Sequence, residues 1–220
     1  NYDLVVATGD YADTADGWPV VVEAFRQLDA KLGVYASLGG HERYPGLGEV
    51  SSIWMGWRAI TSRIRPRRLI DPAPLIAALE AEGVRVLVNE NLSLEIEGEL
   101  VRLIAVDDAY MGLADLEAAL PAPDSGGFRL LLSHSPDGLL HPRSGEVDLA
   151  LCGHTHGGQI TFPLLGAPVR HARSVGRREP AGLLRIGGVT TFVSRGFGTS
   201  LLPLRLGARP ELAVVELRRA

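Results

Sequence analysis

The chain has 220 residues, of which 46% are hydrophobic, so it is long enough to bury a substantial core within one domain. Its formal net charge of −4 at pH 7 gives no electrostatic reason to expect a nucleic-acid partner. The single cysteine, Cys152, excludes an internal disulfide, and the sequence contains no run of about 20 apolar residues that would span a bilayer.

The first part of the chain alternates between strand and helix patterns. An apolar run at 4–8 predicts a strand that ends just before Asp10, and a helical pattern follows at 18–31. A second strand, predicted at 33–38, ends shortly before His41. Polar residues after successive strands are typical of an open α/β sheet, in which ligands bind beyond the carboxyl ends of the strands.

Residues 46–70 differ from their surroundings because they carry five arginines and no acidic residue between Glu49 and Asp71. Apolar residues, Trp54 and Trp57 among them, recur at helical spacing on one side of this segment. A basic amphipathic helix with tryptophans can lie in a membrane interface. We therefore expect either membrane or lipid contact through 53–68, or an excursion whose apolar face packs on the domain.

The remaining pattern continues the α/β alternation and shows no repeat or linker, so we expect a single domain over 1–220. The predicted elements are a helix from Asp71 to Glu82, a strand at 84–88, a hairpin of strands at 92–96 and 100–106, a short helix at 112–120, and strands at 128–132, 147–152, 183–186, 189–193 and 212–217.

Residues 153–159 read Gly-His-Thr-His-Gly-Gly-Gln and directly follow a predicted buried strand. Glycine allows the backbone to turn sharply and to approach a ligand closely. Neutral imidazole is the commonest protein ligand for transition metals. His154 and His156 therefore predict a metal site.

Ligand-type side chains follow four predicted strands, namely Asp10, His41, His134 and the pair His154/His156. Parallel strands bring their carboxyl ends to one edge of a sheet, so we expect these side chains to meet there. A mixed Asp/His set suits one or two divalent ions of Zn, Mn or Fe. Such ions activate a bound water, and a histidine that binds no metal can protonate the leaving oxygen of a phosphate ester.

Four sequence blocks resemble successive motifs of the calcineurin-like metallophosphoesterases. These blocks are 9–13 (Gly-Asp-Tyr-Ala-Asp), 39–42 (Gly-Gly-His-Glu), 133–134 (Ser-His) and 153–156 (Gly-His-Thr-His). The longer strings at 153–160 and 193–200 resemble the bacterial membrane-associated branch, which includes UDP-2,3-diacylglucosamine pyrophosphatase-like enzymes. The resemblance implies a four-layer α/β/β/α sandwich and a bacterial protein located in the cytoplasm or peripherally at the membrane.

The same resemblance implies the metal ligands. Asp10 would bridge two metals, His134 and His154 would hold the second metal, and His156 would hold the first.

The resemblance also implies the catalytic residues. His41 would be the general acid, oriented by Glu42. Arg195 is our candidate for a phosphate contact because its planar guanidinium suits phosphate, and a purely structural arginine is the alternative.

Two departures from the family pattern bear on the metals. The first motif of the family is an Asp-x-His block that supplies two ligands to the first metal. This chain lacks it, so we expect a few dozen residues to precede this chain. Gly40 stands where the family has an asparagine ligand. The first metal then keeps Asp10 and His156, whereas the second keeps Asp10, His134 and His154. Three ligands plus water make a zinc-type site and two rarely do, so one metal is favoured.

The expected function is that of a metal-dependent phosphoesterase acting on a phosphodiester, pyrophosphate or phosphomonoester, with a lipid-linked substrate as an extension. Gly40 and the absent block motivate an alternative, a catalytically silent relative that binds a phosphate-bearing or lipid partner. A mononuclear zinc hydrolase acting on another bond, such as an amide, is a third hypothesis, although the chain lacks a His-Glu-x-x-His helix.

Overall fold

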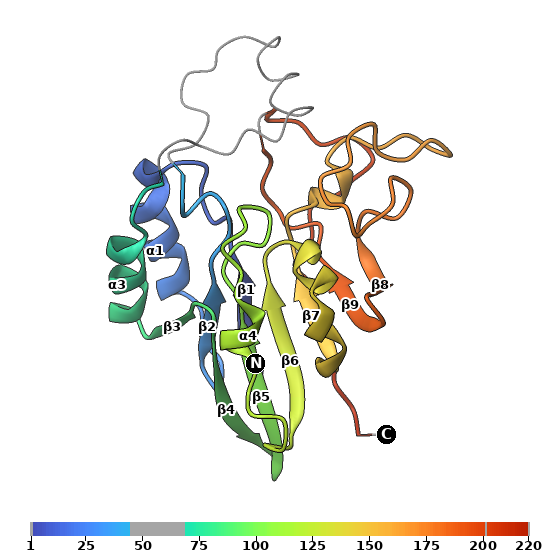
Figure 1. Ribbon diagram of the computed structural model, residues 1–220. Helices are drawn as coiled ribbons and strands as arrows, with labels where there is room; N and C mark the ends of the chain where they lie inside the picture. Colours follow the sequence, from blue (N-terminus) through green and yellow to red (C-terminus); the bar gives the residue numbers. More distant parts are fainter. Residues whose placement is uncertain (1, 45–68, 201, 220) are drawn as a thin grey trace.

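The computed structural model describes residues 2–44, 69–200 and 202–219, which contain two β-sheets lying face to face (Figure 1). The first sheet is parallel, in the order β1-β2-β3, and its strands are β1 (Val5–Thr8), β2 (Val34–Ser37) and β3 (Val84–Leu87).

The second sheet has the order β4-β5-β6-β7-β9-β8. Its strands are β4 (Glu90–Ile96), β5 (Glu99–Ala105), β6 (Phe128–Ser133), β7 (Leu149–Cys152), β8 (Gly182–Ile186) and β9 (Val189–Val193). The four central strands are mutually parallel, whereas β4 and β8 pair antiparallel at the two edges.

Helices cover the outer face of each sheet. α1 (Trp18–Arg26) and α3 (Ala73–Ala81) pack on the first sheet and bury Val21, Phe25, Leu75 and Leu79 against it. The second sheet is covered by α4 (Leu116–Ala119) and the 3-10 turns η2 (Pro136–Leu140) and η3 (Pro142–Glu146). Two further 3-10 turns, η1 (Ala15–Gly17) and η4 (His156–Gly158), lie in loops beyond strands. The predicted α/β/β/α sandwich is confirmed.

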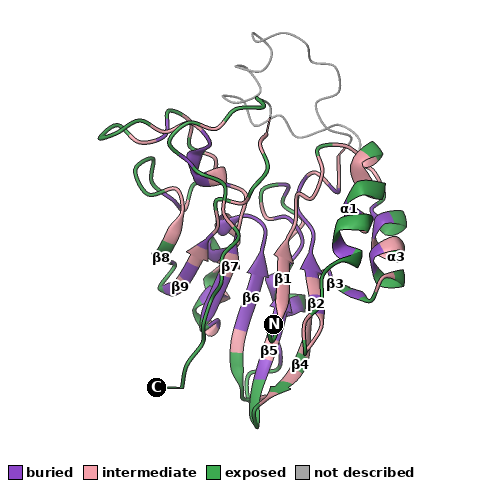
Figure 2. Cartoon of the chain, turned by 180° about the vertical axis from the view of Figure 1, so that it is seen from behind, coloured by how far each residue is buried: buried purple, intermediate pink, exposed green. Residues whose placement is uncertain are grey.

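The central strands of the second sheet are largely buried (Figure 2), and their sequences explain why. Successive side chains of a strand point to opposite faces. In β6, Leu130 and Leu132 pack between the two sheets, whereas Leu131 packs on the helical side. An uninterrupted apolar run, rather than an alternating one, therefore marks a strand buried on both faces.

Some predicted elements differ from the structure. Residues 212–217 form no strand, and their apolar side chains, Leu212 at 84% among them, are largely exposed. A β pattern without a partner strand gains neither hydrogen bonds nor burial, which is why this one fails to form a strand. The first helix ends at Arg26 rather than near 31, and the helix predicted at 112–120 spans only α4.

The basic excursion predicted at 46–70 lies almost entirely outside the described residues. Among the helices that the structure describes, none is long and apolar enough to cross a bilayer.

Leu103 tests the packing between the sheets because it is fully buried in that layer. Leu103→Ala should lower the free energy of unfolding by about 2–5 kcal/mol, through lost transfer energy and the cavity left behind. Urea denaturation measures the change. Leu183→Ala, at a side chain that is 71% exposed, is the matched control and should change stability by less than about 0.5 kcal/mol.

Candidate metal centre

Strand ends from both sheets meet at one end of the molecule. β1 leads to Asp10 and β6 leads directly to His134, and these two strands face each other across the sandwich. The junction is tied by a hydrogen bond from His134 Nδ1 to the backbone oxygen of Thr8, at 2.7 Å. A second bond, from Gly153 N to the backbone oxygen of His134 at 2.9 Å, places the loop after β7 beside them.

Asp10, His134 and His154 form one group whose ligand atoms all lie within 4.8 Å of one another. Asp10 Oδ2 is 2.8 Å from His134 Nε2, and that nitrogen is 3.2 Å from His154 Nδ1. The other nitrogen of each ring has a backbone partner. His154 Nε2 lies 3.2 Å from the backbone oxygen of His171, and His134 Nδ1 lies 2.7 Å from that of Thr8. Such backbone contacts fix imidazole ligands in orientation.

This donor set fits a divalent transition metal. One carboxylate oxygen and two imidazole nitrogens converge, and both rings present the nitrogen that their backbone contacts leave free. Three protein donors with an open position are the pattern of a catalytic rather than a purely structural site.

The backbone at these residues is unusual. Asp10, His154 and His156 have φ values of 55°, 67° and 51°, in the left-handed region that costs a residue with a side chain about 1–2 kcal/mol. Gly9, at φ 83°, is required beside Asp10, because a Cβ there would lie 2.3 Å from Gly39 N. Residues held in such conformations concentrate at functional sites.

Charge in the group is divided between an ion pair and a neutral ring. Burial alone would raise the pKa of Asp10, but the neighbouring His134 outweighs it and holds that pKa well below its ordinary value. Burial opposes protonation of His134, yet Asp10 prevails and raises the pKa of His134 to about 9. Burial, aided by the charge on His134, lowers the pKa of His154 to about 3. A metal bound here would therefore displace a proton from His134.

Glu42 is buried and organises the backbone around Asp10. Its carboxylate accepts hydrogen bonds from the backbone N–H groups of Gly39 at 2.8 Å, Asp10 at 2.9 Å and Tyr11 at 2.7 Å. Burial and the nearby Asp10 raise the pKa of Glu42, against these three donors. Glu42 thereby joins the loops that follow β1 and β2.

The ring of His41 has partners other than the predicted Glu42. Its Nε2 lies 2.7 Å from Tyr44 Oη, and its Nδ1 lies 3.3 Å from the backbone oxygen of Asp13. The same Nε2 is 3.9 Å from Asp10 Oδ2, so the ring adjoins the metal group. The predicted orientation of His41 by Glu42 is therefore wrong. Tyr44 and the backbone of Asp13 contact the His41 ring, whereas Glu42 accepts hydrogen bonds from backbone N–H groups.

His156 lies outside the group of three donors. Its Nδ1 is 3.2 Å from Arg205 Nη2, and its backbone oxygen is 3.1 Å from Arg205 Nη1. Burial, reinforced by this cation, lowers the pKa of His156 to about 4. Its assignment to a first metal stays a prediction.

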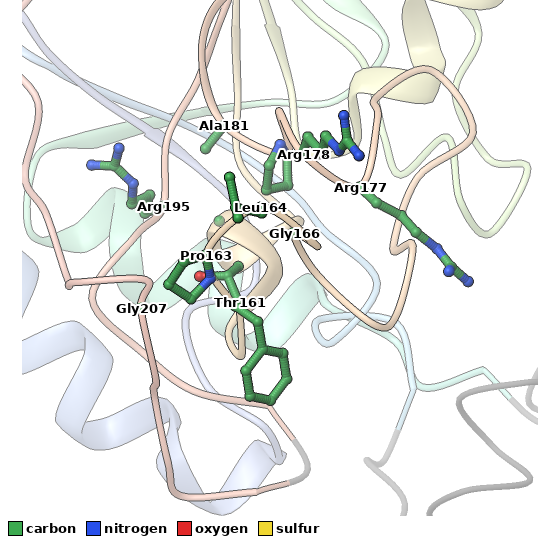
Figure 3. Close-up of a pocket in the computed structure, with 12 residues that line it drawn as sticks. Thr161, Pro163, Leu164, Gly166, Arg177, Arg178, Ala181, Arg195 and Gly207 are labelled. Atoms are coloured by element: carbon green, nitrogen blue, oxygen red, sulfur yellow. The ribbon is translucent and has the colours of Figure 1, made fainter.

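Arg195 is held by an ion pair. Its Nη1 lies 2.5 Å from Glu211 Oε2, and its backbone N donates to Glu211 Oε1 at 2.9 Å. Its side chain lines a cavity of about 430 Å³, where the guanidinium groups of Arg195 and Arg177 point away from each other (Figure 3). Among the described residues that line this cavity, none belongs to the group of three donors. The predicted phosphate contact stays a prediction.

Sequence reasoning passed over two residues at this end of the molecule. Tyr44 contacts His41, and Asp108, 1% exposed, follows β5. Asp108 carried a recognisable signal, since it stands just beyond a strand as Asp10 does, but a carboxylate after a strand is common in turns.

Comparison with known proteins agrees with this geometry. The profile of the calcineurin-like phosphoesterases matches residues 1–158. The uncharacterized metallophosphoesterase YkuE of Bacillus subtilis is 31% identical over 221 residues, which cover 98% of this chain and 68% of the relative. The phosphodiesterase YaeI of Escherichia coli is 36% identical over 217 residues, 98% of this chain and 70% of the relative.

A transmembrane protein with metallophosphoesterase domain from Bos taurus is 30% identical over 237 residues, which cover 99% of this chain and 46% of that protein. The family match and these identities define the class: the chain belongs to the calcineurin-like phosphoesterases, hydrolases that use divalent metal ions.

A substitution at Gly39 tests how tightly this glycine packs against Asp10 and His134. A Cβ at Gly39 would lie 2.3 Å from Asp10 Oδ1 and 2.8 Å from His134 Cγ, so Gly39→Ala must displace one of them. We expect metal affinity, measured by calorimetry, to fall at least ~10-fold. Gly145→Ala is the control, because a Cβ there meets nothing within 4 Å, and it should bind metal normally.

Glu42→Gln replaces an acceptor oxygen with an NH₂ group that faces backbone donors. We expect a loss of unfolding free energy on the order of 3 kcal/mol, because buried hydrogen bonds to a charged group are lost. Chemical denaturation measures it. Glu23→Gln, at a side chain that is 56% exposed, should leave stability nearly unchanged, and an equal loss in both variants would contradict the role of Glu42.

Proposed function

We propose that this chain is a phosphodiesterase whose metal is held by Asp10, His134 and His154. The observation that carries the proposal is the convergence of these three donors at the meeting point of the two sheets. The similarity to a protein named as a phosphodiesterase, YaeI of Escherichia coli, supports a phosphodiester over a pyrophosphate or phosphomonoester. The mixed oxygen and nitrogen donor set favours a single Zn, Mn or Fe ion over Ca or Mg.

A metal held there supplies Lewis acidity and a water of lowered pKa. The protein's own residues provide the rest. Asp10 carries the negative charge of the donor set, and its Oδ1 also accepts from the backbone N–H of His41 at 2.8 Å. The ring of His41, held by Tyr44, is placed beside this carboxylate to give a proton to the leaving oxygen.

A lipid-linked substrate or a membrane surface extends this proposal. Its support is the basic segment 53–68, which lies outside the described residues, and the turn at 162–165, where Leu164 and Leu165 are 89% and 74% exposed. Basic and apolar side chains together suit an anionic, amphipathic partner. The expected position in the cytoplasm or peripherally at the membrane belongs to the same proposal.

Substitutions in the donor set test the proposal. Asp10→Asn and His154→Ala should each abolish metal-dependent hydrolysis of bis(p-nitrophenyl) phosphate in metal-scrubbed buffer supplemented with Mn²⁺ or Zn²⁺, because each removes one donor. His141→Ala, whose ring accepts from Arg143 N away from the group, is the control and should retain activity. Near wild-type turnover in either donor variant would refute the site. An inactive wild type that still binds metal would support a silent, ligand-binding relative.

His41→Ala separates proton transfer from metal binding. Turnover should fall ~10²–10⁴-fold, the usual contribution of a general acid, while metal affinity stays near that of wild type. Single-turnover kinetics and calorimetry on the same sample measure the two quantities. Lost metal affinity would instead make His41 a structural support of Asp10.

A further inference from the structure

The segment 107–111, directly after β5, lies against the metal group. β5 pairs in parallel with β6, so their carboxyl ends reach the same end of the molecule. The ring of Tyr110 is 5.1 Å from the ring of His154, centroid to centroid. Asp108 is 1% exposed in this segment, and its two oxygens accept from the backbone N–H groups of Tyr110 at 3.0 Å and Met111 at 3.2 Å.

The carboxylate of Asp108 fills space that a side chain at position 40 would need. A Cβ added to Gly40 would lie 2.9 Å from Asp108 Oδ2, closer than atoms in contact normally approach, and 3.3 Å from Tyr44 Cε1. At the preceding residue, Gly39, a Cβ would meet Asp10 and His134. Two consecutive glycines thus allow the same loop to contact the donor group on one side and Asp108 on the other.

Asp108 is a buried carboxylate whose hydrogen-bond partners in the described part of the chain are backbone N–H groups. The guanidinium of Arg43, in the loop that follows Gly40, is paired with the neighbouring Asp107. Burying a carboxylate without a cation is costly. Burial is the main cause that raises the pKa of Asp108; the charge of His134 opposes this rise and the charge of Asp10 adds to it.

We propose that Asp108 is a further carboxylate of the metal centre, which strengthens ion binding, and that Gly40 leaves the room for it. The inference rests on the proposed function, because it requires a divalent ion at Asp10, His134 and His154. Asp108 lies outside the group of three mutually close donors. Its carboxylate would add a second negative charge beside them, which together with Asp10 balances both charges of the ion. In this proposal the Asp108 carboxylate takes the place of the family's asparagine side chain at position 40, so Gly40 does not impair the site.

Metal affinity tests the proposal directly. Asp108→Asn keeps the oxygen that accepts from Tyr110 and removes the charge, and it should weaken the binding of Zn²⁺ or Mn²⁺, measured by calorimetry, by about 10–100-fold. Asp148→Asn is the matched control: its carboxylate also accepts from a backbone N–H, that of Arg129, but it precedes β7 at the opposite end of the sheet. This control should bind metal as wild type does.

A double-mutant cycle separates the proposal from a general loosening of the loop. Gly40→Ala should weaken metal binding because its Cβ displaces the Asp108 carboxylate. In an Asp108→Ala background the same change should have no further effect, because the space is then free. Additive losses would mean that the two positions act separately and would overturn the proposal.

The outcomes are distinct from those that test the proposed function. A wild-type protein that binds no metal refutes the metal centre itself. A wild type that binds metal, together with an Asp108→Asn variant of equal affinity, overturns only the role of Asp108. Circular dichroism checks folding, and if Asp108→Asn fails to fold, Gly40→Ala against Gly145→Ala decides: equal metal affinity in that pair overturns the proposal.

Discussion

The candidate metal centre depends on the buried carboxylate of Glu42, which accepts hydrogen bonds from three backbone N–H groups in two loops. These donors belong to the turns that follow neighbouring parallel strands, and both turns contain left-handed or tightly packed glycines. Without an acceptor, converging N–H groups buried away from water would each cost free energy comparable to a lost hydrogen bond. Glu42 removes that cost, and Asp10 is thereby fixed with its side chain directed at His134.

Much of the fold was predictable because its sheets follow simple periodicities. β6 is a continuous apolar run and is buried on both faces, and Asp10, His134 and His154 stand just beyond strands whose carboxyl ends converge. The contacts that orient the site were harder to predict. Glu42 sits beside His41 in sequence, yet its carboxylate turns to backbone N–H groups, because partners set by loop conformation leave no trace in residue spacing.

Other features were hard to predict for a similar reason. The segment at 212–217 has the composition of a strand but lacks a partner in the described part of the chain, and strand formation depends on neighbours more than on the strand's own residues. Arg195 was favoured because of its chemistry, and its phosphate contact stays a prediction; its ion pair with Glu211 was not visible in the residue pattern. In the sequence, Asp108 resembles an ordinary turn residue. Only the structure shows that its carboxylate occupies the space that a side chain at position 40 would need.

The hydrogen bond from His134 to Thr8 links the two sheets at the metal group. Asp10 belongs to one half of the sandwich and both histidines belong to the other, so an ion bound by all three residues bridges two halves that are otherwise joined mainly by apolar contact. Such an ion binds the assembled sandwich and not the separated halves, and at a concentration 100 times its dissociation constant it adds about 2.7 kcal/mol of stability. If the proposed ion binds there, removing it with a chelator would lower both the activity and the free energy of unfolding.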